Sequence, residues 1–395
     1  MSLDFDSARL PNPNLRPEHN EWRSQLRKFI DAEIMPYAQD WDESGHIPIE
    51  LWPKAAAVGL LGLGYPEEFG GIGEGIDCWH MWIANEELAR IGVGGIPASL
   101  MVHGIGLPPV INWGSQALKE KVAPPVLAGD KHIALGITEP GGGSDVAQLA
   151  TTAVLDGDHY IVNGSKTYIT GGMRANWVST AVRTGGKGAG GVSMLLIPTD
   201  AQGFSRTQLD KKQGWWASDT ATLYFDNVRV PVENLIGEEG SGFRYILDGM
   251  NAERILIAAE CIGDARYFID RASHYACERE VFGRAIGQNQ GIQFPIARAY
   301  VETEAAAGMV ERATALFEAG ESCGSQANMA KLLASEASWH AGDTCVQTFG
   351  GYGFAEEYDI ERKFRETRLY QVAPISTNLI LSHIATHELD MPRSF

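Results

Sequence analysis

A glycine-rich stretch at residues 136–148, GITEPGGGSDVAQ, is the part of this chain best suited to hold a large ligand. It follows a strand-like apolar run, and its consecutive glycines let a ligand approach the backbone and its N–H groups closely. Thr138 and Ser144 add short hydroxyls that donate and accept hydrogen bonds. A solvated hairpin loop is the alternative that such a stretch leaves open.

A second candidate lies at residues 347–366, QTFGGYGFAEEYDIERKFRE. Glycine costs about 1 kcal/mol in a helix interior, so FGGYGF predicts a break between two helices. Three ordered charges follow it, at Glu357, Arg362 and Glu366. Taken alone, this segment is more simply explained as an ordinary helix–helix turn, and the charges after it as a solvated helix face with i,i+4 pairs.

The elements that position these segments change character twice along the chain. Apolar spacing predicts helices over 19–38, 51–61 and 76–91, separated by Gly/Pro loops. From about 132 to 239, short β-rich runs bounded by turn residues follow, with a hairpin signal at DGDHYIVNG. This middle segment is expected to form a compact β-barrel.

The last part returns to helical periodicity, with small residues at close contacts, as in a bundle. Helices are expected over 242–275, 290–319, 325–349 and 362–388. The predicted fold class is therefore α+β. The expected domains are an N-terminal α-helical domain at 1–132, a middle β-barrel at 133–240 and a C-terminal four-helix bundle at 241–395.

Composition narrows the function classes. The chain has 395 residues and a formal net charge of −18, which disfavours nucleic acid and anionic membranes as partners. No apolar run is long enough to span a bilayer. The five cysteines form no CxxC pair, so neither a disulfide framework nor a metal site is expected. The start, MSLDFDSARLPNPN, lacks a basic region followed by an apolar core, which favours a cytoplasmic, bacterial protein if that start is native.

The two glycine-rich segments together resemble the fingerprints of the acyl-CoA dehydrogenase family, and the resemblance covers essentially the whole chain. GITEPGGGSD at 136–145 is similar to the first fingerprint, and Gln347–Phe354 with the three charges after it is similar to the second. Gln148 departs from the small residue usual there. Other matching runs, in order, are KTYITGG at 166–172, FDNVRVP at 225–231, GSGF at 240–243 and ERxxFGRxIGxxQ at 278–290.

The resemblance implies a FAD enzyme that converts an acyl-CoA to the trans-2-enoyl-CoA in fatty acid β-oxidation. It further implies electron-transfer flavoprotein as the electron acceptor and a homotetramer built as a dimer of dimers. The implied flavin contacts within one subunit are Thr138, Gly143, Ser144, Tyr168, Thr170, Ser376 and Asn378. Those implied to reach the adenosine diphosphate side, in part from a neighbouring subunit, are Arg279, Phe282, Gln290, Gln347, Gly350 and Gly351.

The implied reaction needs a carboxylate beside the acyl α-carbon, in a dry site that raises its pKa towards neutrality. Many family members carry this glutamate in a turn that corresponds here to YQVAPISTN, where Pro374 occupies its position. Branched-chain and some long-chain members carry it on the first bundle helix, immediately before an arginine. Glu253, followed by Arg254, matches that placement and is the expected base. A surface glutamate near a helix start is the alternative.

Pro374 also lacks the N–H that, in typical members, helps a flavin hydroxyl hold the thioester carbonyl. Either Ala373 or Ile375 donates instead, or the oxyanion hole is weaker, at a cost of roughly 10²–10³ in rate. For the substrate, the resemblance implies Ser144, Met101 as the floor of the acyl pocket and His103 as its wall, with ordinary core packing as the alternative for the last two. For Arg254, CoA binding and a structural ion pair are equally open alternatives.

Two other functions remain open on the same scaffold. An acyl-CoA oxidase, or another flavin enzyme such as a desulfinase or a nitroalkane-type oxidase, would differ in its electron acceptor or its chemistry. A catalytically silent flavoprotein that acts as a binding partner would fit Pro374, but Glu253 and the intact flavin motifs oppose it.

Overall fold

The computed structural model describes residues 9–393, and the chain divides into two compact units. The helical unit comprises the chain up to Gln39, Asp77–Pro97 and the chain from Asn251 onward. The sheet unit comprises Asp40–Ile76 and Ala98–Met250. Most of the N-terminal stretch behind the cytoplasmic expectation lies outside the described residues.

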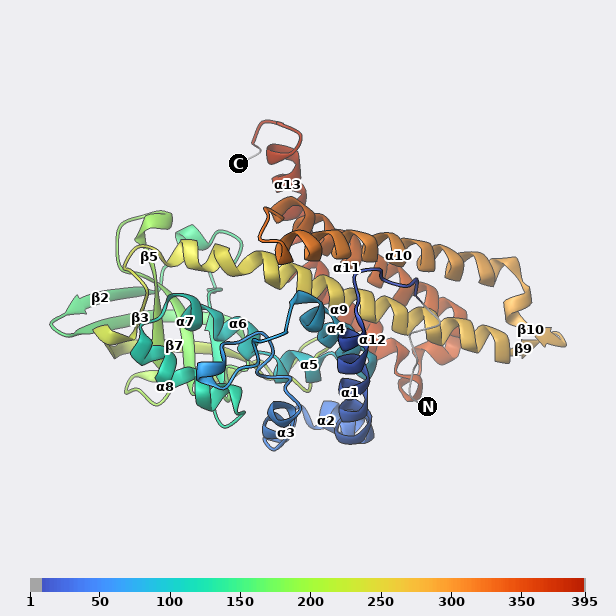
Figure 1. Ribbon diagram of the computed structural model, residues 1–395, viewed down its shortest axis with the longest axis horizontal. Helices are drawn as coiled ribbons and strands as arrows, with labels where there is room; N and C mark the ends of the chain where they lie inside the picture. The colour runs from blue at the N-terminus through green and yellow to red at the C-terminus, as the bar shows by residue number, and fades with distance from the viewer. Residues whose placement is uncertain (1–8, 394–395) are drawn as a thin grey trace. The chain divides into compact units, whose positions relative to one another are not determined.

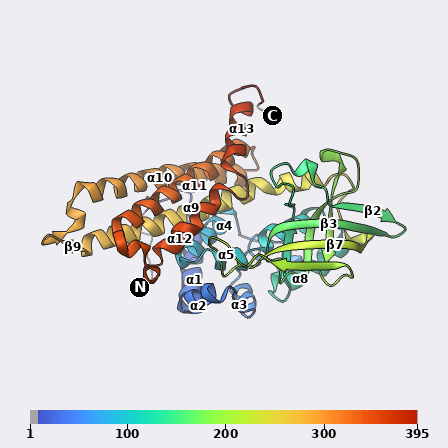
Figure 2. The same cartoon turned by 180° about the vertical axis from the view of Figure 1, so that it is seen from behind.

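Long helices dominate the helical unit, and α9, α10 and α11 run alongside one another in both views of the chain (Figures 1 and 2). The expected bundle helices at 242–275, 290–319 and 325–349 are confirmed. The helices are α1 (Pro17–Glu33), α4 (Cys78–Leu88), α9 (Gly242–Glu278, which starts in the sheet unit), α10 (Gln290–Glu318), α11 (Gly324–Phe349), α12 (Ile360–Thr367) and α13 (Thr377–His387). Shorter elements are η2 (Met35–Tyr37), η4 (Ala89–Ile91), β9 (Glu280–Val281), β10 (Arg284–Ala285), η8 (Ile286–Gln288), η9 (Gly350–Phe354), η10 (Glu356–Tyr358) and η11 (Arg368–Gln371).

Small residues let these helices approach closely. A Cβ at Gly342 of α11 would lie 2.9 Å from Phe364 and 3.1 Å from Phe268, so only glycine leaves room for both rings. The surrounding core includes Ala272 of α9 and Ala299 of α10, which fits the expected bundle of small contact residues.

The sheet unit combines short helices with one main sheet. Its helices are α3 (Leu51–Ala57), η3 (Glu67–Phe69), α6 (His103–Gly106), α7 (Pro108–Trp113), α8 (Gln116–Leu127), η5 (Val146–Gln148), η6 (Ala189–Gly191) and η7 (Val232–Asn234). Its strands are β1 (Ile133–Gly136), β2 (Thr152–Asp156), β3 (His159–Thr170), β4 (Trp177–Arg183), β5 (Val192–Pro198), β6 (Phe204–Gln208), β7 (Thr220–Pro231) and β8 (Leu235–Ile236). Two helices, α2 (Ala38–Ser44) and α5 (Gly95–Leu100), lie where the chain passes between the units.

Seven of the eight strands follow the order β6-β7-β3-β2-β4-β5-β8, and the eighth, β1, pairs with β4 in parallel. The compact β-barrel expected from the sequence is observed as a central sheet domain, in which β2, β3 and β7 lie side by side (Figure 2). The strand order ends at β6 and β8, and the sheet branches at β4, where β1 pairs. The predicted hairpin is confirmed, because Asp156 of β2 pairs with His159 of β3. The antiparallel β3–β7 ladder has register shifts after Val162 and after Lys166.

Both faces of β5 are buried, and its side chains alternate between two cores. Met194 and Leu196 join the core that contains α8, whereas Leu195 and Ile197 join the core between strands. This period of two is the geometry of a strand covered on both faces.

Some expected helices are shorter than predicted. The helix predicted over 362–388 is wrong: α12 and η11 end at Gln371, and α13 begins only at Thr377. Pro374 interrupts it, because proline has no N–H for the helical ladder, and Ser376 then caps α13 by accepting from Leu379 N–H at 3.3 Å. The helix predicted over 19–38 similarly ends at Glu33, before Pro36.

Arg362 and Glu366 of the second motif are buried. The interpretation of these charges as a solvated helix face is therefore wrong for these two residues. Arg362 Nη2 donates to Asp359 Oδ1 at 2.6 Å and Arg362 Nε donates to the Gly92 carbonyl at 3.3 Å. The Gly94 N–H donates to Glu366 Oε2 at 2.7 Å. These two side chains join α12 to the 92–94 segment, whereas Glu357 is exposed.

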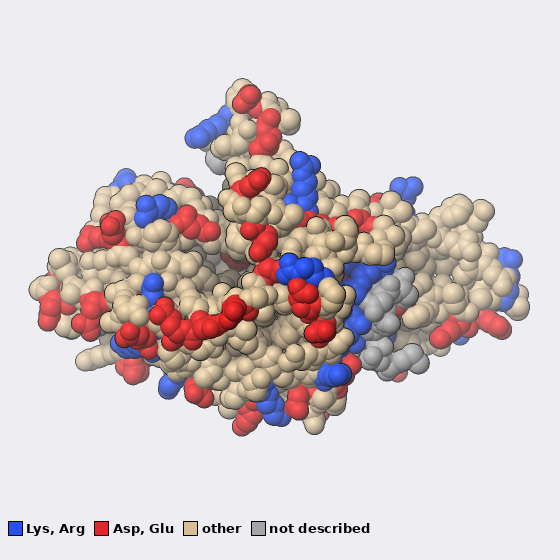
Figure 3. Space-filling view, in the orientation of Figure 1, with Lys and Arg blue, Asp and Glu red and all other residues tan. Residues whose placement is uncertain are grey.

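Within residues 9–393, no helix is long and apolar enough to cross a bilayer. On the face seen in Figure 3, acidic groups are spread broadly with basic groups between them, and no extended basic surface stands out on that face.

Candidate active site

The glycine-rich loop after β1 folds back on itself in the sheet unit. A Cβ at Gly143 would lie 3.0 Å from Thr138 Cγ2, which is tighter than an ordinary van der Waals contact, so glycine favours this close approach. Thr167 N–H donates to the Thr138 carbonyl at 2.8 Å, which joins the loop to β3. Ser144 is exposed at the loop surface. The loop therefore presents backbone and hydroxyl groups from a fixed base.

A buried ion pair anchors this loop. Lys166 Nζ lies 2.8 Å from Glu139 Oε1 and donates to the Ile137 carbonyl at 3.0 Å. Glu139 also accepts the N–H groups of Ala150 and Thr151, at 2.6 and 2.9 Å. Although burial alone would raise it, these hydrogen bonds and the lysine charge lower the pKa of Glu139 to about 2. The loop is thereby fastened to β3 and to the two residues just before β2.

Tyr168 projects from an irregular point of β3. It has φ of 58° and is 66% exposed, next to the register shift after Lys166. A positive φ is strained for an aromatic residue and persists only where the surroundings impose it. The result is an aromatic face offered to solvent, suited to stack on a flat ring, with half-buried Thr170 two residues on.

The segment predicted to line the acyl pocket lies beside the end of β3. A Cβ at Gly171 would lie 3.2 Å from Val102 Cγ1, so Met101 and His103 flank a residue that packs against this strand end. His103 Nε2 lies 3.0 Å from the Leu61 carbonyl, and burial lowers its pKa to about 4. The imidazole is therefore neutral at pH 7, and Met101 is half-buried.

Glu253 lies in the part of α9 that belongs to the helical unit. Its side chain is half-buried, and burial raises its pKa to about 7, against the opposing effect of the Arg254 charge. Arg254 Nη1 donates to Asn251 Oδ1 at 3.0 Å. A carboxyl group with a pKa near neutrality is suited to general-base chemistry at pH 7.

The turn at residues 371–376 is fixed from several sides. The N–H groups of Val372 and Ala373 both donate to the Leu369 carbonyl, at 2.8 and 2.9 Å. Lys331 Nζ of α11 donates to the Ile375 carbonyl at 2.7 Å. Ser376 caps α13, and Asn378 is exposed in its first turn.

The remaining predicted flavin contacts lie at the far end of α9. The Arg279 guanidinium lies 5.6 Å from the ring centre of Tyr352, next to Gly350 and Gly351 in η9. Phe282 is fully exposed, with φ of 55°, and Gln290 and Gln347 are also exposed. Arg279 follows Glu253 by 26 residues, about 39 Å along a helix. One chain therefore does not bring this group to Glu253.

Sequence reasoning missed Glu139, Lys166 and Lys331. A signal existed for the first two, because Glu139 lies inside the quoted motif ITEPGGGSD and Lys166 is the single charge of KTYITGG. Lys331 is the one charge in the stretch ANMAKLLAS of α11. Its side chain is fully buried, and this burial results from the tertiary packing.

A separate group of ligand-type side chains, His19, Asp77 and His80, has a structural explanation. Asp77 caps α4, and its carboxylate lies 3.0 Å from His19 Nε2 and 2.8 Å from His80 Nδ1. His19 Nδ1 accepts the Arg16 N–H at 2.9 Å. These hydrogen bonds thus join the N-terminal ends of α1 and α4.

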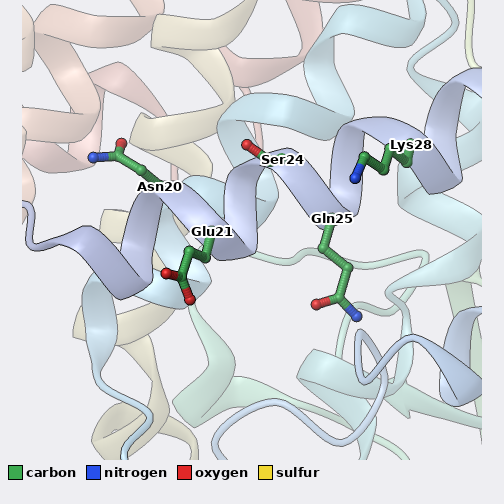
Figure 4. A pocket seen from close by; sticks show the side chains of 5 residues that line it. All are labelled: Asn20, Glu21, Ser24, Gln25 and Lys28. Atoms are coloured by element: carbon green, nitrogen blue, oxygen red, sulfur yellow. The ribbon is translucent and has the colours of Figure 1, made fainter.

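The exposed face of α1 borders a shallow depression, in which polar side chains project from one helix (Figure 4). It contains none of the predicted site residues. Its lining is Asn20, Glu21, Ser24, Gln25 and Lys28.

Comparisons with known proteins agree with this arrangement. Three family models match consecutive parts of the chain: "Acyl-CoA dehydrogenase, N-terminal domain" over residues 16–130, "middle domain" over 134–228 and "C-terminal domain" over 240–388. An acyl-CoA dehydrogenase of Bacillus subtilis (strain 168) is 36% identical over 352 residues, which are 89% of this chain and 92% of that protein.

Solved structures give the same result. A probable acyl-CoA dehydrogenase from Mycobacterium abscessus has a TM-score of 0.92 at 41% identity, covering 94% of this chain and 99% of that one. A glutaryl-CoA dehydrogenase from Mycobacterium smegmatis in complex with FADH2 has a TM-score of 0.90 at 26% identity, covering 96% of each. The fold is that of a flavoenzyme that oxidises acyl thioesters. The chain belongs to the acyl-CoA dehydrogenase family, which is FAD-dependent.

Proposed function

We propose that this chain dehydrogenates an acyl-CoA between Cα and Cβ to the trans-2-enoyl-CoA, with Glu253 as the base that removes the α-proton. The observation that carries the proposal is the half-buried Glu253, whose pKa is raised to about 7. Pro374 occupies the alternative position for a base and has no ionisable group. Glu253 is thus matched to proton abstraction at neutral pH.

The residues present fit FAD. Gly143 packs closely against Thr138, where a Cβ would lie only 3.0 Å from Thr138 Cγ2, and the exposed Tyr168 ring offers a stacking face. Thr138, Gly143, Ser144, Tyr168 and Thr170 would hold the flavin side, together with Ser376 and Asn378. The residues named would place FAD so that it could supply the acceptor, at its N5, for the β-hydride. The chain's own residues orient the thioester and receive the α-proton.

The adenosine diphosphate part of FAD would be held by a neighbouring subunit. Its contacts would be Arg279, Phe282, Gln290, Gln347, Gly350 and Gly351. Two observations support this: the separation of about 39 Å between Arg279 and Glu253 along α9, and the complete exposure of Phe282. A homotetramer, built as a dimer of dimers, would complete the site. The proposed domains are 1–132, 133–240 and 241–395.

The acyl-CoA would lie against Ser144, with Met101 as pocket floor, His103 as wall and Arg254 towards the CoA. The neutral His103 supports a wall for an uncharged acyl chain, since it adds no charge to the pocket. Electron-transfer flavoprotein is the proposed acceptor, and fatty acid β-oxidation the proposed setting.

Anaerobic bleaching of the flavin by a panel of acyl-CoAs tests the proposal. Wild-type enzyme is expected to bleach with at least one chain length, and Glu253→Gln to bleach with none while retaining FAD. Glu260→Gln is the matched control. Glu260 lies on the same helix, is buried, has a pKa also raised to about 7, and accepts Tyr370 O–H at 2.9 Å, a bond that Gln can keep. It is expected to bleach within about threefold of wild type.

Three other results would contradict a part of the proposal or indicate a different function. Bleaching by Glu253→Gln at the wild-type rate would exclude Glu253 as the base. Absence of bleaching by wild type with every acyl-CoA would favour the silent flavoprotein. Rapid reoxidation in air with release of hydrogen peroxide would identify an oxidase.

A further inference from the structure

We propose that the backbone N–H of Ser376 replaces the donor lost at Pro374 and holds the thioester carbonyl oxygen, and that Lys331 is the positioning residue that fixes its direction. This inference rests on the proposed function, because it assigns a role within the same site. It concerns a backbone group, whereas the resemblance implies only a flavin contact for Ser376.

The N–H groups of the turn are not equally available. Those of Val372 and Ala373 are used by the Leu369 carbonyl, at 2.8 and 2.9 Å, and Pro374 has none. Among residues 9–393, the N–H groups of Ile375 and Ser376 have no hydrogen-bond partner. Ala373, one of the two donors considered from the sequence, is therefore already committed, and the choice is between Ile375 and Ser376.

The hydrogen bond made by Lys331 favours the Ser376 N–H over the Ile375 N–H as the donor. It is fully buried on α11 and donates to the Ile375 carbonyl at 2.7 Å. The Ile375 carbonyl and the Ser376 N–H belong to one planar trans peptide, in which the two groups point in opposite directions. A hydrogen bond that holds the carbonyl edge therefore also fixes the N–H edge and directs it away from Lys331. A preorganised donor of this kind stabilises developing negative charge without reorganising.

The rest of the turn is fastened in the same way. Tyr370 enters the turn fully buried, with its hydroxyl donating to Glu260 Oε1 of α9 at 2.9 Å. Thr377 Oγ1 donates to the Gln371 carbonyl at 3.3 Å, which ties the end of the turn to its beginning. The Ile375–Ser376 peptide is thus held between anchored ends.

The same peptide lies in the neighbourhood of the proposed base. Glu260, whose carboxylate accepts the Tyr370 hydroxyl at the start of the turn, follows Glu253 by seven residues on α9. Seven residues are about two helical turns, or roughly 10 Å, along the same face of the helix. The turn that contains Ser376 is therefore anchored to the face of α9 that carries Glu253.

Ser376→Pro, compared with Ser376→Ala, isolates the N–H. Both variants lose the hydroxyl and the helix cap, but only proline also loses the N–H. The φ of Ser376 is −69°, which proline adopts without strain. The rate constant of anaerobic flavin reduction by a matched acyl-CoA is expected to be about 10²–10³ lower for Ser376→Pro than for Ser376→Ala. FAD occupancy is expected to be the same in the two variants, because both lose the same hydroxyl.

A 3-thiaacyl-CoA gives a readout that a purely structural role would not move. It can lose its α-proton but resists hydride transfer, so its enolate accumulates beside oxidised flavin as a charge-transfer band. This band is expected to weaken by about the same factor in Ser376→Pro as the reduction rate. A band equal to that of Ser376→Ala would overturn the assignment of the donor.

Lys331 is tested by Lys331→Met, which removes the donor, and Lys331→Gln, which keeps a shorter one. The reduction rate is expected to fall roughly 10- to 100-fold in Lys331→Met, because the Ser376 N–H is released from its direction, and less in Lys331→Gln. These variants also decide the matter if Ser376→Pro does not fold. Lys331→Met with a wild-type rate would overturn the positioning role.

Failure of the proposed function gives a different result. If no acyl-CoA bleaches the wild-type flavin, the proposed function falls and this inference falls with it. If wild type is active but Ser376→Pro matches Ser376→Ala within about threefold, only the Ser376 assignment fails. Loss of activity in Ile375→Pro with full activity in Ser376→Pro would transfer the role to Ile375.

Discussion

Lys166 Nζ lies 2.8 Å from Glu139 Oε1, and this buried pair joins the glycine-rich loop to the strand that carries Tyr168. The carboxylate also receives two backbone N–H groups, so three interactions meet at Glu139, and Lys166 adds a fourth by donating to the Ile137 carbonyl. The geometry of the proposed flavin face therefore depends on a pair that is not among the proposed flavin contacts.

Lys166→Met is expected to destabilise the protein by about 3–5 kcal/mol, because it leaves a buried carboxylate without its cation. Urea unfolding measures the loss. Lys187→Met, at an exposed loop position, is the control and is expected to change stability by less than about 0.5 kcal/mol. Adding Glu139→Gln to Lys166→Met should restore part of the loss. A double variant no more stable than Lys166→Met would contradict this account.

Acid is expected to weaken the same pair. The folded-state pKa of Glu139 is about 2, below the value of about 4.3 in an unfolded chain. Its contribution to stability is therefore complete above about pH 4.3 and is lost as pH falls towards 2. The stability difference between wild type and Glu139→Gln should shrink between pH 6 and pH 3 in urea titrations. A constant difference across that range would rule out this carboxylate as the source.

The rate of flavin reduction is expected to increase as pH rises through about 7, because Glu253 accepts the α-proton only when it is deprotonated. Rapid mixing of enzyme with acyl-CoA across pH 5.5 to 8.5 measures this limb directly. A rate independent of pH over that range would mean that a different group, or a different pKa, controls the step.

Glu253 should also reduce stability at neutral pH. Its folded pKa of about 7 exceeds its ordinary value of 4.5, so the folded protein keeps a proton that the unfolded chain releases. Stability from this group therefore falls as pH rises from about 4.5 to 7. Glu253→Gln should raise the melting temperature more at pH 8 than at pH 5. An equal rise at both values would show that charge burial is not the cause.

Phe282 tests the neighbouring-subunit contact. Phe282→Gly relieves a positive φ, so the β9–β10 hairpin should remain folded. If the exposed ring is buried against a second subunit or its FAD, its loss should weaken FAD retention roughly tenfold or more. Flavin release on dilution and light scattering measure the effect. Val154→Ala, also at an exposed apolar side chain, is the control and should change neither.

Much of the fold could be predicted from local chemistry. The helices over 242–275, 290–319 and 325–349 followed from apolar periodicity, and the hairpin at 156–159 from its turn residues. The helix predicted over 362–388 was wrong, because the prediction continued the last bundle helix through Pro374. Proline interrupts the hydrogen-bond ladder whatever the surrounding periodicity.

The candidate site, like the fold, could be predicted only in part from the sequence. The identities of Thr138, Gly143, Tyr168 and Glu253 were available as residue types at fixed positions in recognisable motifs. The partners that hold those motifs were not. Lys166 meets Glu139 across 27 residues and Lys331 meets Ile375 across 44, and no local pattern encodes contacts of that separation.

The sequence by itself determined the family resemblance, the position of the proposed base and the absence of an N–H at Pro374, because these depend on residue type and order. Only the tertiary structure decided which buried charges are paired, which turn N–H groups are already used, and how the pKa of Glu253 is raised. Those properties depend on burial and on distances between distant segments, and packing of the whole chain sets both.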